Sequence, residues 1–549
     1  MTMAAPSTLR TAPIARVDLK VGLEIHVELS AASKMFSRIG SVAHRQGFAA
    51  QPNTLIDPLT LGLPGSLPVL NQRAIEMSIR VGLALGCSIA TISRWDRKSY
   101  FYPDMPKNYQ ISQYDLPLCF DGMVTLPAID ERGVCDWARS GRQIGIIRAH
   151  LEEDAGKLLH ELPGGAAVAD ASVVDFNRAG TALLEIVTAP DFRSAEEVVV
   201  FAQQLRNICR TLGVTEGIMQ RGHMRFEPNI NCELHFSDGQ TVATPIVEVK
   251  NLNSFRAVRS AILHELAHQP NRWRESGITL DRGTKTTRGW DDAAEITFVQ
   301  REKEEASDYR YFPDPDLLPV RIDASWVMQT RDNLPEMPAA RRLRYTGEFT
   351  LGAKEVEQLV DEPAVCRLLD AAAAAAAVHG ISVQRAGRQA ANILLQSGAK
   401  RANELTSARD ESAGNQPVLI SDLGVLAEHL GELVAMREQG EVNSNAVDEL
   451  FGSLCAPHAG GPALPLDGAA SVRLLASARG LIVMRDDAEI ERWCIEAISQ
   501  QPQAAADVRA GKQQAIGRLV GAAMKVAAGR GDAAQLREVL LRLLGGSSS

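Results

Sequence analysis

The sequence contains no stretch near the ~20 apolar residues that a membrane-spanning helix needs, so we expect no membrane segment. Its eight cysteines include no Cys-x-x-C pair and are scattered, which argues against a zinc ribbon and a disulfide framework and favours a reducing compartment. Basic residues are also fewer than acidic ones: the chain has 58 Lys and Arg and 67 Asp and Glu, which gives a formal net charge of −9. That balance argues against a generally basic nucleic-acid coat but leaves room for a local basic face.

Common catalytic motifs are missing as well. The Gly- and Pro-rich stretch Leu61–Pro68 lacks the Gly-Lys-Ser/Thr ending of a P-loop, and its prolines cannot donate backbone amides to a phosphate. The sequence also has no nucleophile elbow. Any phosphate binding must therefore use other residues.

What is present suggests a globular enzyme of several domains: 549 residues, 45% apolar and 23% charged. Short β-like runs fill residues 17–320, helical patterns fill 321–455, a Pro- and Gly-rich linker is expected at 456–471, and amphipathic helices follow at 472–549. Residues 1–16 are expected to be a disordered leader, with a mitochondrial presequence as the alternative. The run Ala371–Ala377 predicts a helix surface or an inserted helical extension.

Residues Val21–Leu29 alternate strictly between apolar and other residues, which predicts a β-strand. Glu24, His26 and Glu28 share one face, with neighbouring side chains about 6.6–6.8 Å apart. Two carboxylates around an imidazole can hold a hard cation or transfer protons. The same pattern also fits the solvent-facing side of an antiparallel strand, so this segment alone does not decide.

Further acids lie where they need a partner. Glu152, Glu153 and Asp154 are consecutive, so their charges repel unless a cation neutralises them, although a hydrated surface loop would tolerate them. Glu185 lies inside an apolar β-like run without a local partner, and it is open whether this position is functional. Glu248 shares a strand face with Lys250 and could simply pair with it.

The segment Asp96–Asp115 is the densest polar and aromatic run. Its lysines could neutralise phosphate while its rings stack on bases. Of the seven tyrosines, four lie between Tyr100 and Tyr114, and Tyr309 and Tyr311 form a second group. Such crowding favours a cleft wall, although two aromatic turns packed on a sheet would look alike.

Together, and in this order, these segments resemble the B subunits of the tRNA-dependent amidotransferases, the GatB family of GatCAB. The matching segments are Val21–Leu29, Leu63–Asn71, Asp96–Asp115, His150–Lys157, Val174–Gly180, Glu248–Phe255, Thr287–Asp291 and Asp308–Asp316, with a further patch at Gly511–Lys525. The resemblance implies an α+β fold: a mixed-sheet cradle domain at 17–320, a helical domain at 321–455 and a small all-α tail domain at 472–549.

The resemblance also implies an activity. A GatB protein would use ATP and Mg²⁺ to phosphorylate the side-chain carboxylate of Glu-tRNA(Gln) or Asp-tRNA(Asn). Ammonia, freed from glutamine by the A subunit, an amidase, would then displace the phosphate. Implied partners are this amidase and the small C subunit in a heterotrimer, and tRNA(Gln) or tRNA(Asn), without a membrane. The implied location is the cytoplasm, with the mitochondrial matrix as a minor alternative.

By the same resemblance, roles can be assigned to individual residues. The catalytic group would be Glu24, Lys98, Tyr100 and Glu153, and the metal ligands Glu24, His26, Glu153, Glu185 and Glu227. Nucleotide or substrate would be bound by Lys107, Arg225, Asn229, Glu248, Lys250 and Asn251. Arg509, Lys512, Arg518 and Lys525 would form a basic tRNA-binding face on the tail, unless they are simply a solvated helix surface.

The sequence also departs from the family pattern. Glu227 and Pro228 stand where the family commonly has Asp and another residue, which changes the reach of the carboxylate and removes a backbone donor. Ser37, Asp57 and Thr60 occupy positions of a zinc knuckle found in some relatives, so no zinc is expected. Two other hypotheses stay open: a tRNA-binding scaffold without chemistry, and a free-standing Mg²⁺-dependent phosphohydrolase.

Overall fold

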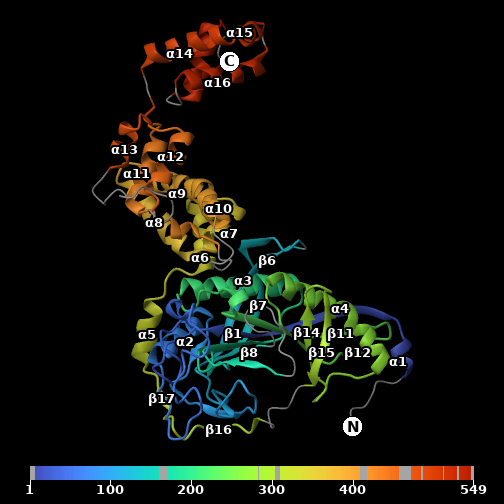
Figure 1. The fold of residues 1–549 in the computed structure, drawn as a ribbon. Helices are drawn as coiled ribbons and strands as arrows, with labels where there is room; N and C mark the ends of the chain where they lie inside the picture. Colours follow the sequence, from blue (N-terminus) through green and yellow to red (C-terminus); the bar gives the residue numbers. More distant parts are fainter. Residues whose placement is uncertain are drawn as a thin grey trace. The chain divides into compact units, whose positions relative to one another are not determined.

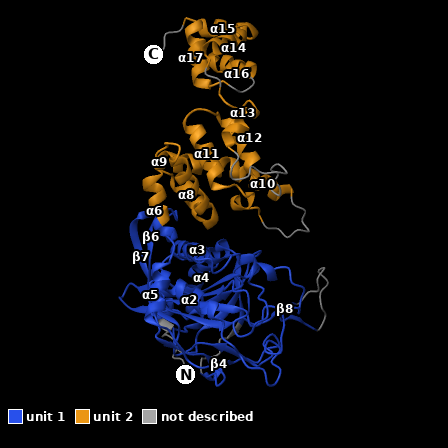
Figure 2. Cartoon of the chain, turned by 90° about the vertical axis from the view of Figure 1, so that its left-hand side faces the viewer, with its two compact units in different colours: residues 1–340 blue, residues 341–549 orange. Residues whose placement is uncertain are grey.

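The computed structural model describes residues 7–130, 132–159, 171–281, 283–302, 309–408, 417–456, 471–483, 486–510, 512–527 and 531–545. This described part of the chain forms two compact units, Met1–Ala340 and Arg341–Ser549 (Figure 2). Within the described residues, no helix is both long and apolar enough to cross a bilayer. The predicted linker lies outside the described residues from 457 to 470.

A mixed β-sheet organises the first unit. Among the described residues it has ten strands, in the order β15-β14-β13-β11-β1-β10-β7-β6-β2, with β12 paired to β11 (Figure 1). β13 and β14 run parallel and the other pairs run antiparallel. The strands are β1 (Ile14–Glu28), β2 (Ser88–Ile89), β6 (Cys119–Ile129), β7 (Cys135–Glu153), β10 (Ala182–Thr188), β11 (Met224–Phe236), β12 (Thr241–Ala243), β13 (Val247–Lys250), β14 (Thr286–Asp291) and β15 (Ile296–Glu302).

Smaller sheets complete this unit. The strands β16 (Phe312–Pro313), β4 (Asp96–Ser99) and β5 (Tyr109–Ser112) pair with one another, and so do β17 (Val320–Arg321) with β3 (Ile92–Ser93) and β8 (Lys157–Leu159) with β9 (Val173–Asp175). The β16–β4–β5 sheet lies on the side of the large sheet away from the helices (Figure 1). It carries the tyrosine-rich segment predicted to wall a cleft.

The predicted alternation in the first strand is confirmed. Val21, Leu23 and Ile25 of β1 are at most 1% exposed and belong to the main core. That core lies between the sheet and three helices, α2, α3 and α4, of the described chain. The helices begin at side-chain caps from Asn71, Ser194 and Ser254, which accept hydrogen bonds from the otherwise unpaired first amides. Their bounds are α2 (Gln72–Ala84), α3 (Ala195–Thr211) and α4 (Phe255–Ser276), with short 3₁₀ turns at Arg45–Gly47 and Met219–Arg221.

The ends of the predicted cradle domain differ from the structure. α5 (Ala324–Asp332) packs on α2, and Trp326 contacts the main core, so the first unit continues beyond residue 320. Residues 1–6 lie outside the described chain, but α1 (Ser7–Thr11) is a helix and β1 already begins at Ile14. Leu9 is buried against a small cluster that includes Trp273 of α4, and this apolar contact orders part of the predicted leader.

The second unit is helical in its described residues, as predicted. Its first core is built from α6 (Pro338–Glu348), α7 (Ala353–Val360), α8 (Pro363–Ala377), α9 (Val383–Ile393), a π-helical turn at Leu394–Gly398, α10 (Ala399–Ala408), a 3₁₀ turn at Ile420–Leu423, α11 (Ala427–Glu438), α12 (Ser444–Leu454) and α13 (Val472–Ala478). α13 belongs to this core because Val472 and Ala476 are buried in it. The tail core therefore begins after the predicted residue 472.

The alanine run forms part of α8, but it is not simply a helix surface. Ala372, Ala373 and Ala376 are buried, and the helix packs closely on α11. A Cβ added at Gly431 of α11 would lie 2.5 Å from the Cβ of Ala375. Small side chains on both helices thus allow a close approach that larger residues would prevent.

The tail has a separate core, made by α14 (Asp487–Gln500), α15 (Pro502–Arg509), a 3₁₀ turn at Gln513–Ala515, α16 (Ile516–Val526) and α17 (Ala533–Leu543). Trp493, Leu519 and Leu536 are among its buried residues. The predicted basic residues lie outside this core, since Arg509, Lys512, Arg518 and Lys525 are exposed. Arg518 and Lys525 are seven positions apart on α16 and so share one helix face.

Candidate active site

Strand register gathers the polar residues on one face of the large sheet, which we call the acidic face. His26 of β1 stands opposite Glu185 of β10 and Arg225 of β11, and Glu24 stands opposite Glu227. Glu185 in turn stands opposite His150 of β7. Since directly opposed residues point to the same side of a sheet, side chains from separate segments meet there. The opposite face of these strands is the apolar one that the helices cover.

Among the described residues, the acidic face holds two overlapping groups that could bind a cation. One is Glu24, His26 and Glu227, and the other is His26, Glu152 and Glu185; in each, the ligand atoms lie within 4.8 Å of one another. His26 Nε2 is 3.7 Å from Glu152 Oε1 and 3.6 Å from Glu185 Oε2. Carboxylate oxygens suit Mg²⁺, and one imidazole is compatible with several divalent ions.

The pKa values of the two histidines around Glu185 are shifted in opposite directions. Burial would lower the pKa of His26, but nearby Glu185 and the charge of Glu227 outweigh burial and raise it to about 9. His150 Nε2 is 3.5 Å from Glu185 Oε2, yet burial lowers the pKa of His150 to about 4. A protonated His26 would have to lose its proton before its imidazole could bind a metal ion.

The carboxylates of Glu152 and Glu185 compete for the same positive charge. Burial and the charge of Glu185 raise the pKa of Glu152. The pKa of Glu185 is lowered, because the neighbouring His150, His26 and Lys98 outweigh its burial. A divalent cation between the two carboxylates would replace the shared protons and relieve this repulsion.

The acidic face also contains polar atoms that still need a partner. In the described residues, His26 Nδ1, His150 Nδ1, Arg225 Nε and Asn229 Oδ1 are buried without a hydrogen bond. Buried polar groups are rarely left so, which suggests that this face takes up a ligand or water. The donor set and these orphaned atoms fit a bound Mg²⁺ and a polar substrate.

Glu153 does not join either group, and this corrects the predicted ligand set. Residues alternate along β7, so Glu153 faces away from Glu152 and stands opposite Ala182. Its carboxylate forms an ion pair with Lys107 and accepts a hydrogen bond of 3.0 Å from the Ile111 amide. Both side chains are about 5% exposed or less. Lys107, predicted to bind nucleotide, is thus held in a buried ion pair.

Lys98 does reach the acidic face. Burial would lower its pKa, but the negative charges of Glu152 and Glu185 outweigh burial and raise it. Its Nζ lies 4.8 Å from the centre of the Tyr309 ring. Lys98 is therefore charged beside the proposed metal ligands. Tyr100 instead stacks on Tyr102, with ring centres 5.2 Å apart.

The two tyrosine groups meet, as the crowded aromatics suggested. Tyr114 and Tyr311 stack with ring centres 4.3 Å apart, and Tyr309 meets Tyr311 edge-on at 6.1 Å. Tyr114 is 43% exposed. An aromatic wall with an accessible ring thus stands beside Lys98.

The other predicted binding residues follow the β11–β13 side of the same face. Asn229 stands opposite Glu248, and Lys250 Nζ lies 2.5 Å from Glu227 Oε2 and 3.7 Å from Glu248 Oε1. Glu248 accepts a hydrogen bond from Thr287. Asn251, exposed after β13, adopts the left-handed conformation that asparagine tolerates. Glu227, despite its departure from the family pattern, keeps a carboxylate on the acidic face.

Arg225 lies on the same face but is engaged with an acid that sequence reasoning did not assign. Its Nη2 lies 2.6 Å from Asp154 Oδ2, and Arg178 Nε lies 3.6 Å from the same oxygen. Sequence reasoning also missed Glu152 and His150. The signal was present: extending the alternation of β7 from His150 places Glu152 and Asp154 with it and leaves Glu153 on the other side.

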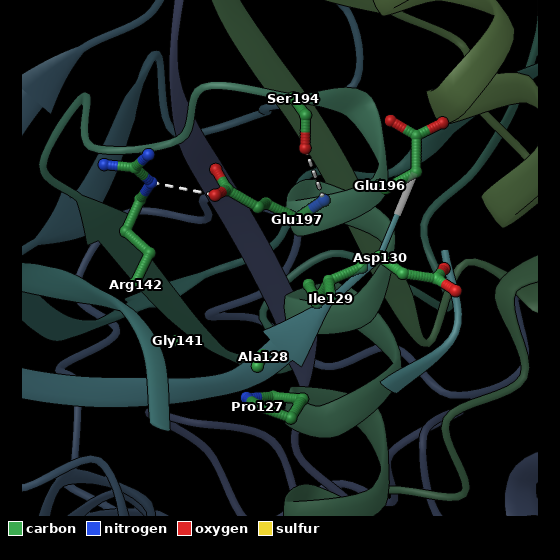
Figure 3. Close-up of a pocket in the computed structure, with 9 residues that line it drawn as sticks. All are labelled: Pro127, Ala128, Ile129, Asp130, Gly141, Arg142, Ser194, Glu196 and Glu197. Atoms are coloured by element: carbon green, nitrogen blue, oxygen red, sulfur yellow. Dashed lines mark hydrogen bonds and ion pairs between the residues drawn. The ribbon is translucent and has the colours of Figure 1, made fainter. Parts of the chain in front are cut away.

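A hollow of about 540 Å³ lies apart from the acidic face, between the β6–β7 hairpin and the start of α3 (Figure 3). Arg142 and Glu197 form an ion pair of 2.8 Å across it, and Ser194 caps α3 by accepting a hydrogen bond from the Glu197 amide. It contains none of the predicted site residues. Its lining consists of Pro127, Ala128, Ile129, Asp130, Gly141, Arg142, Ser194, Glu196 and Glu197.

Comparisons with known proteins match almost the whole chain. Residues 19–328 match the model of the GatB/GatE catalytic domain, and residues 382–544 match the model of the GatB domain. The first of these ranges includes all the residues of the acidic face named above. The second includes the tail helices that carry the exposed basic residues.

Three relatives illustrate the similarity, and each is named as the B subunit of aspartyl/glutamyl-tRNA(Asn/Gln) amidotransferase. The chain is 39% identical to the protein of Rhodopirellula baltica over 526 residues, 96% of each chain. It is 38% identical to that of Synechococcus elongatus over 537 residues, covering 98% of this chain and 99% of the relative. It is 39% identical to that of Thermomicrobium roseum over 521 residues, covering 95% and 97%.

Proposed function

The chain belongs to the GatB family, and from this we propose that it is the B subunit of a tRNA-dependent amidotransferase. The similarity to named relatives over nearly the whole of both chains carries the proposal. The activity is a ligation that forms the side-chain amide of Gln or Asn on a tRNA first charged with Glu or Asp. The buried acidic face is the place in this chain where that chemistry can occur.

The reaction needs a leaving group on the substrate carboxylate, because a carboxylate is a poor electrophile. An oxygen of the Glu or Asp side chain takes the γ-phosphoryl group of ATP, which forms an acyl phosphate and ADP. The nitrogen of ammonia then attacks the acyl carbon, the C–O bond to phosphate breaks, and inorganic phosphate leaves. The amide keeps two of the ammonia hydrogens, and one proton goes to a base or to solvent.

ATP and Mg²⁺ are part of this proposal. His26, Glu152 and Glu185 would hold one Mg²⁺, and Glu24 and Glu227 with His26 offer a second position. Bound Mg²⁺ supplies positive charge that stabilises the phosphoryl oxygens. Lys98, charged next to Glu152 and Glu185, would add a cation at the same place.

The surroundings of the acidic face suggest how the substrates are held. Lys250 and Asn229 extend it along β11 and β13, where they can orient phosphate or the substrate carboxylate. Arg225, fixed by Asp154, would add charge at the opposite end. We assign Glu248 and Asn251 to the part of the acidic face next to Lys250 and Asn229. Lys107 we assign to support of β7 through Glu153, and Tyr100 to a separate stacked pair with Tyr102.

As a GatB protein the chain would assemble with the amidase and the small C subunit into a heterotrimer and act on tRNA(Gln) or tRNA(Asn). Ammonia would come from glutamine that the amidase hydrolyses. The bacterial relatives suggest a cytoplasmic location.

The exposed basic residues of the tail are expected to contact tRNA phosphates. Replacing Arg518 or Lys525 by Gln should weaken tRNA binding for any tRNA sequence and lower the salt dependence of log K by about one unit of slope each. Binding of the assembled heterotrimer to tRNA, measured at several salt concentrations, checks this. Glu538→Gln on α17 serves as an exposed control without a lost cation. Unchanged slopes in both basic variants would assign the residues to a solvated surface.

The proposed function is tested by reconstitution of the chain with the amidase and the small C subunit. With mischarged Glu-tRNA(Gln) or Asp-tRNA(Asn), ATP, Mg²⁺ and glutamine, amide should form on the tRNA and ATP should be converted to ADP. Omission of ATP, of tRNA or of the amidase should each stop amide formation. Binding of tRNA without ATP use would indicate a scaffold. ATP turnover by the isolated chain without tRNA would indicate a phosphohydrolase.

A further inference from the structure

Helix α4 carries two histidines that face each other across one turn. His264 and His268 end the run His264-Glu265-Leu266-Ala267-His268, an H-E-x-x-H spacing that puts both imidazoles on one face of a helix. Their rings stack, with centres 4.0 Å apart and planes at 17°. His268 is exposed and His264 is half-buried, so both can be reached from solvent. We call them the α4 histidine pair. They belong to the helix layer, on the other side of the large sheet from the acidic face (Figure 1).

A hydrogen bond leaves one nitrogen of His268 ready for a metal ion. Its Nδ1 lies 2.8 Å from the backbone oxygen of His264. A carbonyl oxygen only accepts, so Nδ1 carries the proton in this contact, and in a neutral ring Nε2 then keeps its lone pair. Metal-binding histidines usually donate their second N–H in this way, often to a backbone carbonyl. His268 therefore has the tautomer of a ligand that coordinates through Nε2.

His264 can supply the second nitrogen. Among the described residues neither of its ring nitrogens has a hydrogen bond, and the ring meets Trp290 edge-on with centres 6.1 Å apart. Because the two imidazoles are nearly parallel, that of His264 must turn about its Cβ–Cγ bond before both nitrogens can reach one ion at about 2.0–2.1 Å. This torsion is broad in histidine. Ordinary side-chain motion therefore suffices for the pair to chelate an ion.

Glu265 does not take the part that the glutamate has in H-E-x-x-H proteases, where it is the general base beside the metal. It is fully buried. Thr297 donates a hydrogen bond of 2.6 Å to its Oε1, and Gln269 and Arg272 donate to its Oε2. Both oxygens are thus engaged inside the protein. The pair can bind a metal ion, but without this hydrolytic chemistry.

We propose that the α4 histidine pair is an exchangeable binding site for a divalent transition-metal ion such as Zn²⁺, Ni²⁺ or Cu²⁺. Imidazole nitrogen suits these ions, whereas Mg²⁺ prefers oxygen. Arg272 and Arg288 add positive charge near His264, which further disfavours an ion held by charge alone. Among the described residues, groups of three or more possible ligands occur only on the acidic face, so the pair offers two ligands and water fills the other positions. The site uses no cysteine and is distinct from the zinc-knuckle positions near the N-terminus.

The first test is retention of the untagged full-length chain on a resin that carries chelated Ni²⁺, with elution by imidazole. Only exposed side chains reach an immobilised ion, so the buried acidic face does not respond. We expect the unaltered chain to be retained. His264→Gln and His268→Gln should each elute early, close to the double variant, because one imidazole cannot chelate. Two linked ligands can bind about 10²–10⁴-fold more tightly than either alone.

His379→Gln is the matched control, because it removes an exposed histidine from the other compact unit and should be retained like the unaltered chain. Passage of the unaltered chain without retention would overturn the proposal. Losses that simply add, with each single variant midway between the unaltered chain and the double variant, would overturn it too, because that pattern marks two independent surface histidines. The substituted positions are accessible to solvent, so the variants should fold.

A second measurement uses free Zn²⁺ in equilibrium dialysis with Mg²⁺ in excess. At a concentration that saturates the pair, His268→Gln should bind one zinc ion fewer than the unaltered chain, since its affinity at this site falls about 10²-fold. Equal zinc contents of the two chains would contradict the proposal. Zinc that the variant still binds belongs to other places, the acidic face included. Amide formation does not enter either readout, so this site and the proposed function can fail independently.

Discussion

Glu152→Gln is expected to lower amide formation by the reconstituted heterotrimer by at least about 10²–10³-fold, the usual loss when one group that stabilises transition-state charge is removed. Gln keeps the size of Glu but removes the negative charge that, with Glu185 and His26, would hold Mg²⁺. Glutamine hydrolysis should continue, because the amidase performs it. Amidated tRNA, ADP and glutamate, measured in the same reaction, separate these steps.

The adjacent residue provides the matched control. Glu153→Gln is the same substitution at the next residue of β7. The side chain of Glu153, however, lies on the other side of the strand, paired with Lys107. We expect it to keep amide formation within about tenfold of the unaltered chain, well short of the loss assigned to a group at the reaction centre. The opposite order, with Glu153→Gln inactive and Glu152→Gln active, would show that the face assignment is wrong.

The second large effect is on stability. Lys107→Met is expected to lower the free energy of unfolding of the first unit by about 3–5 kcal/mol, because it leaves the buried Glu153 carboxylate without its cation. The double variant Lys107→Met/Glu153→Gln should recover most of this loss. In it no unpaired charge is buried, and Gln can still accept the hydrogen bond from the Ile111 amide.

Denaturant unfolding followed by tryptophan fluorescence checks this prediction. Five of the six tryptophans precede residue 341, so the signal reports mainly on the first unit. Lys20→Met is a suitable control, since its ion pair with Glu233 is partly exposed and should matter by about 1 kcal/mol or less. A double variant no more stable than Lys107→Met alone would mean that the methionine, and not the unpaired charge, causes the loss.

Much of the fold followed from local patterns. The alternation of Val21–Leu29 predicted the central strand with its apolar and polar faces, and both are present. The Ala- and Leu-rich stretches predicted the helical second unit. Domain ends were harder to predict, because they depend on which core buries an apolar side chain. Trp326 and Val472 show this, since each packs on a core that precedes it in the chain.

The site was predicted in part. Glu24, His26, Glu185 and Glu227 do meet on one face, although they come from strands far apart in the sequence. Lys98, predicted to neutralise or orient phosphate, also reaches this face beside Glu152 and Glu185, and its role stays a prediction. From the sequence, Lys107 and Tyr100 were as suitable as Lys98 for binding phosphate or nucleotide, because the sequence shows the type of a side chain but not its partners. Their actual partners, Glu153 and Tyr102, depend on how the β4–β5 segment folds over the sheet.

The sequence by itself determined the family of this protein, its helical and β-rich regions, and which acidic, basic and aromatic residues are available for chemistry. These features can be predicted because they depend on residue types and on spacings between residues that are close together in the sequence. Only the tertiary structure decided between Glu152 and Glu153. Neighbouring side chains on a strand point to opposite sides, and which side faces His26 is set by the pairing of β7 with β10, a contact between segments about thirty residues apart.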